Sequence, residues 1–405
     1  MTIRPRLAHG LLAAVVATAT LGAAVHANAQ TIRSEAGPIG VERLAKLDNP
    51  WGVASLPDGR LLVTEKPGRL RVFADGKLSE PVKGVPAVAS EGQGGLLGLA
   101  VDPQFQSNRY VYLYFTEAAD PQPADAKHER DPRLGPNQKL QDTVLKGGAV
   151  ARGRLDGDTL SDVTVIWRQV PKTIGRGHFG GRLVFGRDGT LFITSGERQR
   201  FEPAQDLNSN LGKIVRINSD GSIPKDNPFV GRDGVRPDIW AVGVRNPLGA
   251  TLHPGTGQLW INDMGPKGGD EVVMIEAGKN YGWPLVAEGT HYNDTPIPGH
   301  DTRPEMTAPF HAFEGTVAPS GFAFYRGDRF KGWNEAALIG GLAAQAIVRL
   351  TIFGKVTGEE RIAAGSRVRD VVQTPDGALL VLTDGEGGEL LRLSPGDATI
   401  GKGAR

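Results

Sequence analysis

The chain has 405 residues, a formal net charge of +1 and no cysteine. Near-neutrality excludes the basic field that attracts nucleic acid or an anionic membrane, and the lack of cysteine excludes disulfides and thiolate metal sites. A metal site must therefore use oxygen or nitrogen ligands, which favours calcium over zinc, while 56 glycines and 28 prolines predict many turns between short strands.

The start of the chain has the composition of a secretory signal peptide. Arg4 and Arg6 give a positive beginning, residues 11–25 are apolar and alanine-rich, and residues 27–29 (Ala-Asn-Ala) form a small-x-small cleavage site. The apolar stretch is short for a membrane span, so a retained anchor is the weaker alternative. We therefore expect a bacterial protein that is periplasmic or secreted, without a membrane span, and whose mature part is residues 30–405.

A turn followed by paired apolar runs recurs along the chain. Asp-Gly between apolar runs is a strong hairpin signal, because glycine adopts positive φ without steric cost. Three clear copies and three looser ones make six in all. The clear copies are 57–73, 187–217 and 375–393, and the looser ones are 108–115, 257–262 and 335–340.

Six sheet units without a long amphipathic helix predict an all-β protein, a six-bladed β-propeller with long loops forming a cofactor cleft on one face. Residues 41–47 read as a lone strand that completes the sheet of the final repeat. Beyond the signal peptide (1–29) we expect a single propeller domain, 30–405; two separate β-sandwiches are the alternative.

Two long irregular insertions interrupt the repeats, and loops of this length are usually functional or disordered. On a propeller they are expected to wall a cleft. Residues 118–146 are equally compatible with a surface excursion. Residues 281–310 contain Trp283, His291 and Tyr292, and we expect this segment to pack against the fold.

Several polar residues are placed where chemistry is possible. His178 lies between glycines just before an apolar run, and its neutral imidazole can accept a proton, although a turn histidine is the plainer interpretation. Arg245 and Asn246 follow another apolar run, and a guanidinium fork suits paired oxygens. Arg367 and Arg369 alternate and so share one face of a strand, where they can bind a polycarboxylate or pair with surface acids.

The loop 263–271 (DMGPKGGDE) is tight and carries three carboxylates with free backbone carbonyls. Calcium accepts such oxygens in irregular sets, but the loop lacks EF-hand spacing, and an ordinary acidic turn is as compatible. Ser195 lacks the nucleophile-elbow pattern of a hydrolase.

In chain order these motifs resemble the soluble PQQ-dependent sugar dehydrogenases, the glucose/sorbosone dehydrogenase family, and most closely its aldose sugar dehydrogenase branch. The resemblance covers nearly the whole mature chain. The matching segments are NPWG (49–52), EGQGGLLGLAVDPQF (91–105), GHFGGRLVFGRDG (177–189), GVRNPLG (243–249), DMGPKGGDEV (263–272), GKNYGWP (278–284) and RVRDVVQTPDGALLVLTDG (367–385).

The resemblance implies a propeller that binds pyrroloquinoline quinone (PQQ) over a calcium ion. By this resemblance His178 is the general base, and hydride passes from C1 of an aldose to PQQ, giving a lactone. Electrons then pass to an external acceptor. The other implied contacts are Gln93 to cofactor and substrate, Arg245 and Asn246 to the reactive carbonyl, and Arg367 and Arg369 to the PQQ carboxylates.

The resemblance also implies two calcium sites. Backbone carbonyls of Gly265 and Pro266 hold the cofactor-bound ion, and Asp270 lies in the same pocket. Glu271 and Tyr281 match backbone ligands of a second, structural calcium. The oligomeric state is left between monomer and homodimer.

The chain departs from the family pattern at two positions. Ala343 stands where the family usually has lysine, and Leu248 where it often has glutamine. These departures predict weaker PQQ affinity or altered substrate preference. They leave open a carbohydrate- or protein-binding propeller that has lost tight PQQ binding, while a calcium-dependent lactonase is disfavoured because it needs carboxylate ligands in the channel.

Overall fold

A computed structural model describes Met1 and residues 30–125, 131–135 and 143–396. The predicted signal peptide and part of the first insertion lie outside these ranges. Within them no helix is long and apolar enough to cross a membrane. The helical elements are short: α1 (Phe105–Asn108), η1 (Pro132–Leu134), η2 (Glu202–Ala204) and η3 (His300–Thr302).

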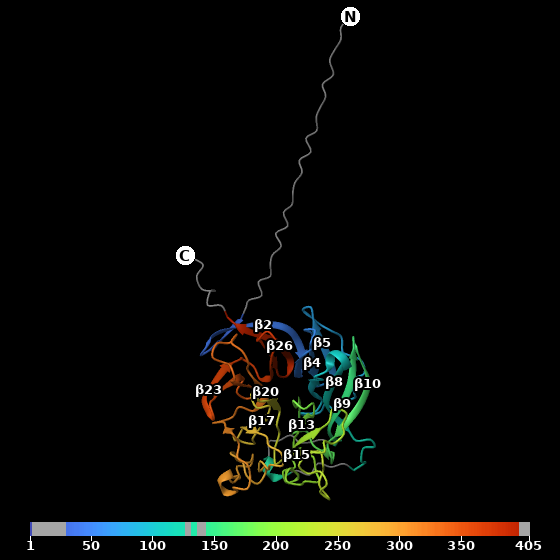
Figure 1. The fold of residues 1–405 in the computed structure, drawn as a ribbon, viewed down its shortest axis with the longest axis vertical. Coiled ribbons are helices and arrows are strands. Elements are labelled where there is room, and N and C mark those ends of the chain that lie inside the picture. The colour runs from blue at the N-terminus through green and yellow to red at the C-terminus, as the bar shows by residue number, and fades with distance from the viewer. Residues whose placement is uncertain (2–29, 126–130, 136–142, 397–405) are drawn as a thin grey trace.

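The described strands form six antiparallel sheets, or blades, which follow one another in chain order, as the colours of Figure 1 show. Blade one contains β3 (Pro50–Ser55), β4 (Leu61–Glu65), β5 (Arg69–Ala74) and β6 (Lys77–Leu78). Blade two contains β7 (Leu96–Val101), β8 (Tyr110–Ala118), β9 (Leu145–Asp156), β10 (Thr159–Arg168) and β11 (Thr173–Ile174). Blade three contains β12 (Gly180–Phe185), β13 (Leu191–Ser195), β14 (Lys213–Ile217) and β15 (Ile239–Val242).

The second half of the ring repeats this plan. Blade four contains β16 (Gly249–Leu252), β17 (Leu259–Asp263), β18 (Glu271–Met274) and β19 (His311–Ala312). Blade five contains β20 (Pro319–Phe324), β21 (Ala337–Gly341), β22 (Ala346–Ile352) and β23 (Val356–Ala363). Blade six contains β24 (Val368–Gln373), β25 (Leu379–Thr383), β26 (Glu386–Pro395), β2 (Gly37–Asp48) and β1 (Gln30–Ser34). Each predicted repeat falls in a different blade.

Blade six joins the two ends of the described chain. β2 pairs antiparallel with β26, with Val41 opposite Leu393 and Leu47 opposite Gly388. β1 then adds the outermost strand. In Figure 1, β2 and β26 lie side by side at the upper edge of the coloured ribbon. The predicted closing role of residues 41–47 and the six-bladed propeller are therefore confirmed, and the two-sandwich alternative is wrong.

The first strand of each blade lies nearest the axis, where neighbouring first strands contact one another around the ring. A Cβ atom at Gly98 in β7 would lie 2.0 Å from the carbonyl oxygen of Gly181, so only glycine fits there. Register shifts interrupt β3, β7, β12, β20 and β24. Two of these bulges contain Trp51 and Arg369, and bulges of this kind re-aim side chains next to functional sites.

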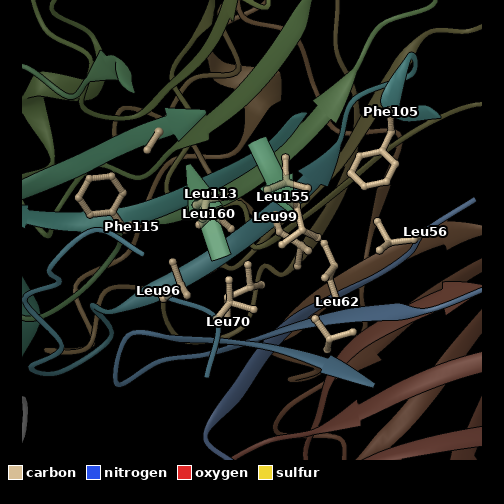
Figure 2. Packing of buried hydrophobic residues seen from close by; sticks show 14 of the residues in the cluster. Leu56, Leu62, Leu70, Leu96, Leu99, Phe105, Leu113, Phe115, Leu155 and Leu160 are labelled. Atoms are coloured by element: carbon tan, nitrogen blue, oxygen red, sulfur yellow. The ribbon is translucent and has the colours of Figure 1, made fainter. Parts of the chain in front are cut away.

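Hydrophobic side chains fill the space between neighbouring blades. Figure 2 shows the layer that joins blades one and two, where Leu62 and Leu70 meet Leu99 and Leu113. All four side chains are buried. Burying one such side chain stabilises the fold by about 1.5–3 kcal/mol. The core is therefore a series of layers, and each blade depends on the blades beside it.

The second insertion packs, as predicted. Trp283 is 4 % exposed and belongs to a small apolar cluster with Phe201, Ile297 and Leu134. Leu134 comes from the described part of the first insertion, and the backbone of Tyr292 donates to the Arg133 carbonyl over 3.1 Å. The described parts of both insertions therefore lie against each other.

Closure of the ring can be tested at Ile39, which is 1 % exposed in β2 and packs beside Leu391 and Leu393. Ile39→Ala removes buried methyl groups and should lower the free energy of unfolding by about 2–5 kcal/mol. Denaturant titration measures the loss. Val230→Ala, at a side chain 41 % exposed, is the control and should change stability by less than about 0.5 kcal/mol. Equal stability of the two variants would contradict a closing role for β2.

Candidate active site

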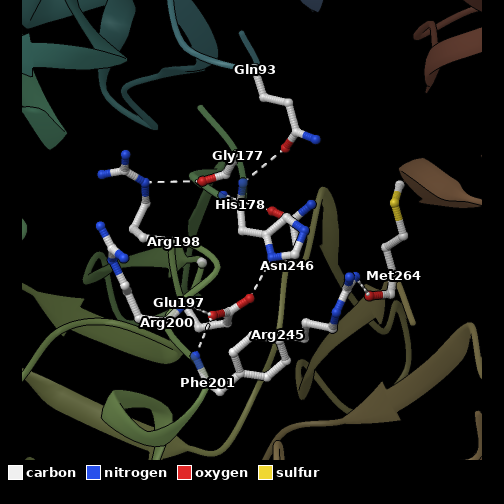
Figure 3. Close-up of polar contacts among 12 residues, drawn as sticks. Gln93, Gly177, His178, Glu197, Arg198, Arg200, Phe201, Arg245, Asn246 and Met264 are labelled. Carbon is white, nitrogen blue, oxygen red and sulfur yellow. Dashed lines mark hydrogen bonds and ion pairs between the residues drawn. The ribbon is translucent and has the colours of Figure 1, made fainter. Parts of the chain in front are cut away.

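The backbone at His178 is held in an uncommon conformation. His178 precedes β12 with φ of 52°, a left-handed value that residues other than glycine seldom adopt. Its N–H donates to Gln93 Oε1 over 2.9 Å, and its carbonyl accepts from the Arg198 N–H over 3.1 Å. The Arg198 side chain donates to the carbonyls of Gly175 and Gly177, over 2.7 and 3.0 Å. Figure 3 shows the contact from Gln93 to the His178 backbone and the contact from Arg198 to Gly177.

Glu197 is the partner of the His178 ring. One carboxylate oxygen hydrogen-bonds His178 Nδ1, and the other accepts the backbone N–H of Phe201 over 2.8 Å. Both side chains are buried. A carboxylate at Nδ1 holds the proton on that nitrogen and leaves Nε2 as the basic one. No residue in the described ranges forms a hydrogen bond to Nε2.

Burial sets the protonation state of this pair. It lowers the pKa of His178 to about 4, and the positive charge of Arg245 acts in the same direction. Burial alone opposes ionisation of Glu197, but His178 and Arg245 together hold its pKa below the usual value. At neutral pH the pair is thus a neutral imidazole beside a carboxylate, and a neutral imidazole can accept a proton.

Arg245 and Asn246 follow β15 and are fixed by Asp263. Their backbone N–H groups donate to the Asp263 carboxylate over 2.7 and 2.6 Å. Burial raises the pKa of Asp263 to about 6. Arg245 Nη1 donates to the carbonyls of Met264 and Gly265, over 2.6 and 2.9 Å. This network ties the strand-end arginine to the loop that carries Gly265.

Two buried donors in this network lack partners among the described residues. They are Arg245 Nε and Asn246 Nδ2. The Asn246 carbonyl oxygen, by contrast, accepts from the Gly180 N–H over 3.1 Å. An unpaired buried donor costs about 1–3 kcal/mol. Both atoms are therefore candidates for contact with a bound polar molecule.

Five of the predicted site residues meet in one pocket, here called the Glu271 pocket. Its lining includes Arg245, Gly265, Pro266, Glu271 and Tyr281, together with Asp263. Burial, followed by the Asp263 and Glu288 charges, holds the pKa of Glu271 well above its usual value. Carboxylates that repel one another in this way favour a cation between them. The described residues contain no group of three or more His, Asp or Glu arranged to hold a metal ion.

A second hollow, the Arg369 pocket, has about 610 Å³ of empty space including its open mouth. Met264 lines both pockets. Both polar and apolar residues line the Arg369 pocket. They are Trp51, Lys66, Gln93, Phe179, Gly180, Asn246, Leu248, Met264, Ala318, Leu342, Arg367 and Arg369.

The two predicted arginines share one acid. Arg367 Nε donates to Asp384 Oδ2 over 2.9 Å, and Arg369 donates to Asp384 Oδ1 over 2.7 and 2.9 Å. Lys66 adds a third cation to the pocket, and no acidic side chain is among its lining residues. The pocket therefore carries excess positive charge, which suits a polycarboxylate.

Asp270 takes a different position from the other predicted residues. Its carboxylate accepts backbone N–H groups of Gly265, Val317 and Ala318, over 3.0, 2.8 and 2.7 Å. It lines neither the Glu271 pocket nor the Arg369 pocket. Asp270 therefore ties the Gly265 loop to residues 317–318 through three backbone hydrogen bonds.

Sequence reasoning missed Glu197, Lys66 and Asp384. A buried histidine base needs a carboxylate partner, but no fixed spacing identifies which acid supplies it. Lys66 occupies a hairpin turn, where a lysine ordinarily faces solvent. Asp384 follows β25 in a Thr-Asp-Gly turn, which reads as a simple turn signal.

The chain is similar to known sugar dehydrogenases along nearly all of its length. The Glucose / Sorbosone dehydrogenase family model matches residues 47–392. An aldose sugar dehydrogenase of Escherichia coli (strain K12) is 41% identical over 361 residues, which cover 86% of this chain and 91% of that protein.

Solved structures share the fold. A crystal structure of a glucose dehydrogenase is 42% identical, with a TM-score of 0.79, and the match covers 87% of this chain and 98% of that one. The PQQ-bound form of an aldose sugar dehydrogenase from Streptomyces coelicolor is 26% identical, with a TM-score of 0.68, covering 88% and 98%.

The titration of His178 tests the electrostatics of the site. In the protein without ligands, the ring should stay neutral down to about pH 4, against 6.5 for an unperturbed histidine. Between these values the unfolded chain takes up a proton that the folded chain does not, so this residue lowers stability as pH falls. NMR of the ring carbons follows the titration, and the spectrum of His178→Ala assigns the His178 signal. A His178 midpoint near 6.5 contradicts this description.

Proposed function

Because the chain belongs to the glucose/sorbosone dehydrogenase family, we propose that it is a PQQ- and calcium-dependent aldose dehydrogenase. It oxidises the C1 hydroxyl of aldoses to lactones and passes the electrons to an external acceptor. The observation that carries this proposal is the buried pair of His178 and Glu197, which supplies a neutral base. His178 itself lines neither pocket, but Phe179 and Gly180, which follow it directly, line the Arg369 pocket.

The residues of the Arg369 pocket fit PQQ, which is planar and carries three carboxylates. Arg367 and Arg369 would bind these carboxylates, and the unpaired Asn246 Nδ2 would donate to an oxygen of the quinone. Gln93 and Trp51 line the same pocket. When bound, PQQ supplies a two-electron acceptor for the hydrogen at C1.

The Glu271 pocket fits calcium. Carbonyls of Gly265 and Pro266 would hold the cofactor-bound ion, and Glu271 with Tyr281 would hold a structural one. Support comes from the raised pKa of Glu271, because a cation removes the repulsion between its carboxylate and that of Asp263. Ligands that are mostly backbone oxygens leave no cluster of acidic side chains.

The protein groups divide the chemistry between them. His178 Nε2 takes the proton of the C1 hydroxyl while C1 loses hydride, so both hydrogens of the oxidation are accounted for. Glu197 stabilises the imidazolium that forms. Arg245 supplies positive charge where negative charge develops on the acceptor oxygen, and its position is preset by Asp263 and Met264.

We also propose that the protein is exported, with cleavage after Ala29 and a mature single domain beginning at Gln30. Support comes from the sequence of residues 1–29 alone. An exported location gives the folded chain access to calcium, PQQ and external sugars.

Reconstitution tests the proposed reaction. The mature protein is loaded with PQQ and calcium, and dye reduction is followed with glucose, galactose, xylose and maltose. We expect reduction with at least one aldose and none after calcium is chelated before loading. No reduction with any aldose, together with no PQQ retained on gel filtration, leaves the binding-only propeller as the better description.

Replacement of the base separates chemistry from cofactor binding. His178→Ala should lower kcat by about 10²–10⁴, the usual contribution of a general base, while PQQ stays bound. His253→Ala, whose ring accepts backbone N–H groups of its own turn after β16, should keep wild-type kcat. Stopped-flow reduction of the loaded enzyme measures the step directly, and an unchanged rate in His178→Ala excludes it as the base.

A further inference from the structure

The Arg369 pocket contains a third cation that the site described above does not use. Lys66 lies in the turn between β4 and β5 and lines the pocket together with Arg367 and Arg369. It is partly buried and comes from blade one, whereas the two arginines come from blade six. The pocket is therefore flanked by positive charge from two neighbouring blades.

The backbone of Lys66 is fixed on both sides. Its N–H donates to the Asn49 carbonyl over 2.9 Å, and its own carbonyl accepts from the Leu96 N–H over 3.0 Å. The side-chain Nζ donates to the Gly92 carbonyl over 2.9 Å. That contact uses one of three ammonium donors, and Gly92 adjoins Gln93, whose side chain accepts the His178 N–H.

The charges around Lys66 do not balance. Asp384 already accepts from both arginines, so three cations share one carboxylate. Burial, followed by the positive charge of Arg369, lowers the pKa of Lys66 from its usual value, and Asp384 only partly opposes this. An anion bound between Lys66 and Arg369 removes this repulsion and satisfies free ammonium donors.

We propose that Lys66 is a cofactor-binding residue, whose ammonium group binds one carboxylate of PQQ opposite the Arg367–Arg369 pair. The inference rests on the proposed function, because it takes PQQ as the polycarboxylate of this pocket. The family usually has a lysine at position 343, next to the lining residue Leu342, but this chain has an alanine there. The proposal gives the pocket a different lysine, which comes from blade one.

The test measures PQQ affinity rather than turnover. Apoprotein with calcium is titrated with PQQ, and free cofactor is separated by ultrafiltration. Lys66→Gln can still donate to the Gly92 carbonyl but lacks the positive charge. Its Kd for PQQ should rise about 10- to 100-fold, the effect of losing one charge-assisted hydrogen bond. The difference from wild type should shrink as salt is raised.

Two further variants keep the outcome interpretable. Lys66→Arg retains the charge and should stay within about threefold of wild type. Lys83→Met, which removes a lysine 74% exposed and paired with Asp158, is the control and should bind PQQ as wild type does. Thermal unfolding of each apoprotein shows whether the variant folds.

The outcomes separate the inference from the function beneath it. Wild-type affinity in Lys66→Gln, or equal weakening in Lys66→Arg and Lys66→Gln, overturns the role of the Lys66 charge while PQQ binding itself stands. Failure of the wild-type apoprotein to bind PQQ overturns the proposed function, and the inference with it. Selective loss in Lys66→Gln supports both.

Discussion

The pairing of β2 with β26 is the contact on which the rest of the molecule depends. It joins the two ends of the described chain in one blade and leaves the ring without a gap. The Arg369 pocket is built across that ring, with Lys66 from blade one, Gly180 from blade three and Arg369 from blade six. Because neighbouring blades pack through shared apolar layers, closure also sets the distances between these groups.

Within the ring, burial sets the protonation states of the ionisable side chains at the site. It keeps the His178 imidazole neutral beside an ionised Glu197, and it raises the pKa of Asp263 and Glu271. Each of these groups is held by backbone or side-chain hydrogen bonds, so none must reorganise when a ligand binds. Preorganised polar groups in a site with little water are the usual source of transition-state stabilisation.

The two pockets share Met264 but differ in their charged side chains. Carboxylates of Asp263 and Glu271 line one of them, and the other is lined by cations without an acid. Arg245 lines the pocket of Asp263 and Glu271 as well, and it donates to the Gly265 carbonyl.

The sequence by itself determined the six-bladed ring, because Asp-Gly turns and apolar runs are local signals that recur once per blade. It also indicated His178, Arg245 and the Arg367–Arg369 pair as candidate site residues, because their neighbours in sequence are distinctive. Only the tertiary structure decided their partners. Glu197 bonds His178, and Lys66 lines the same pocket as the two arginines, although no local pattern relates these segments. The packing of one blade on another sets the distances between them.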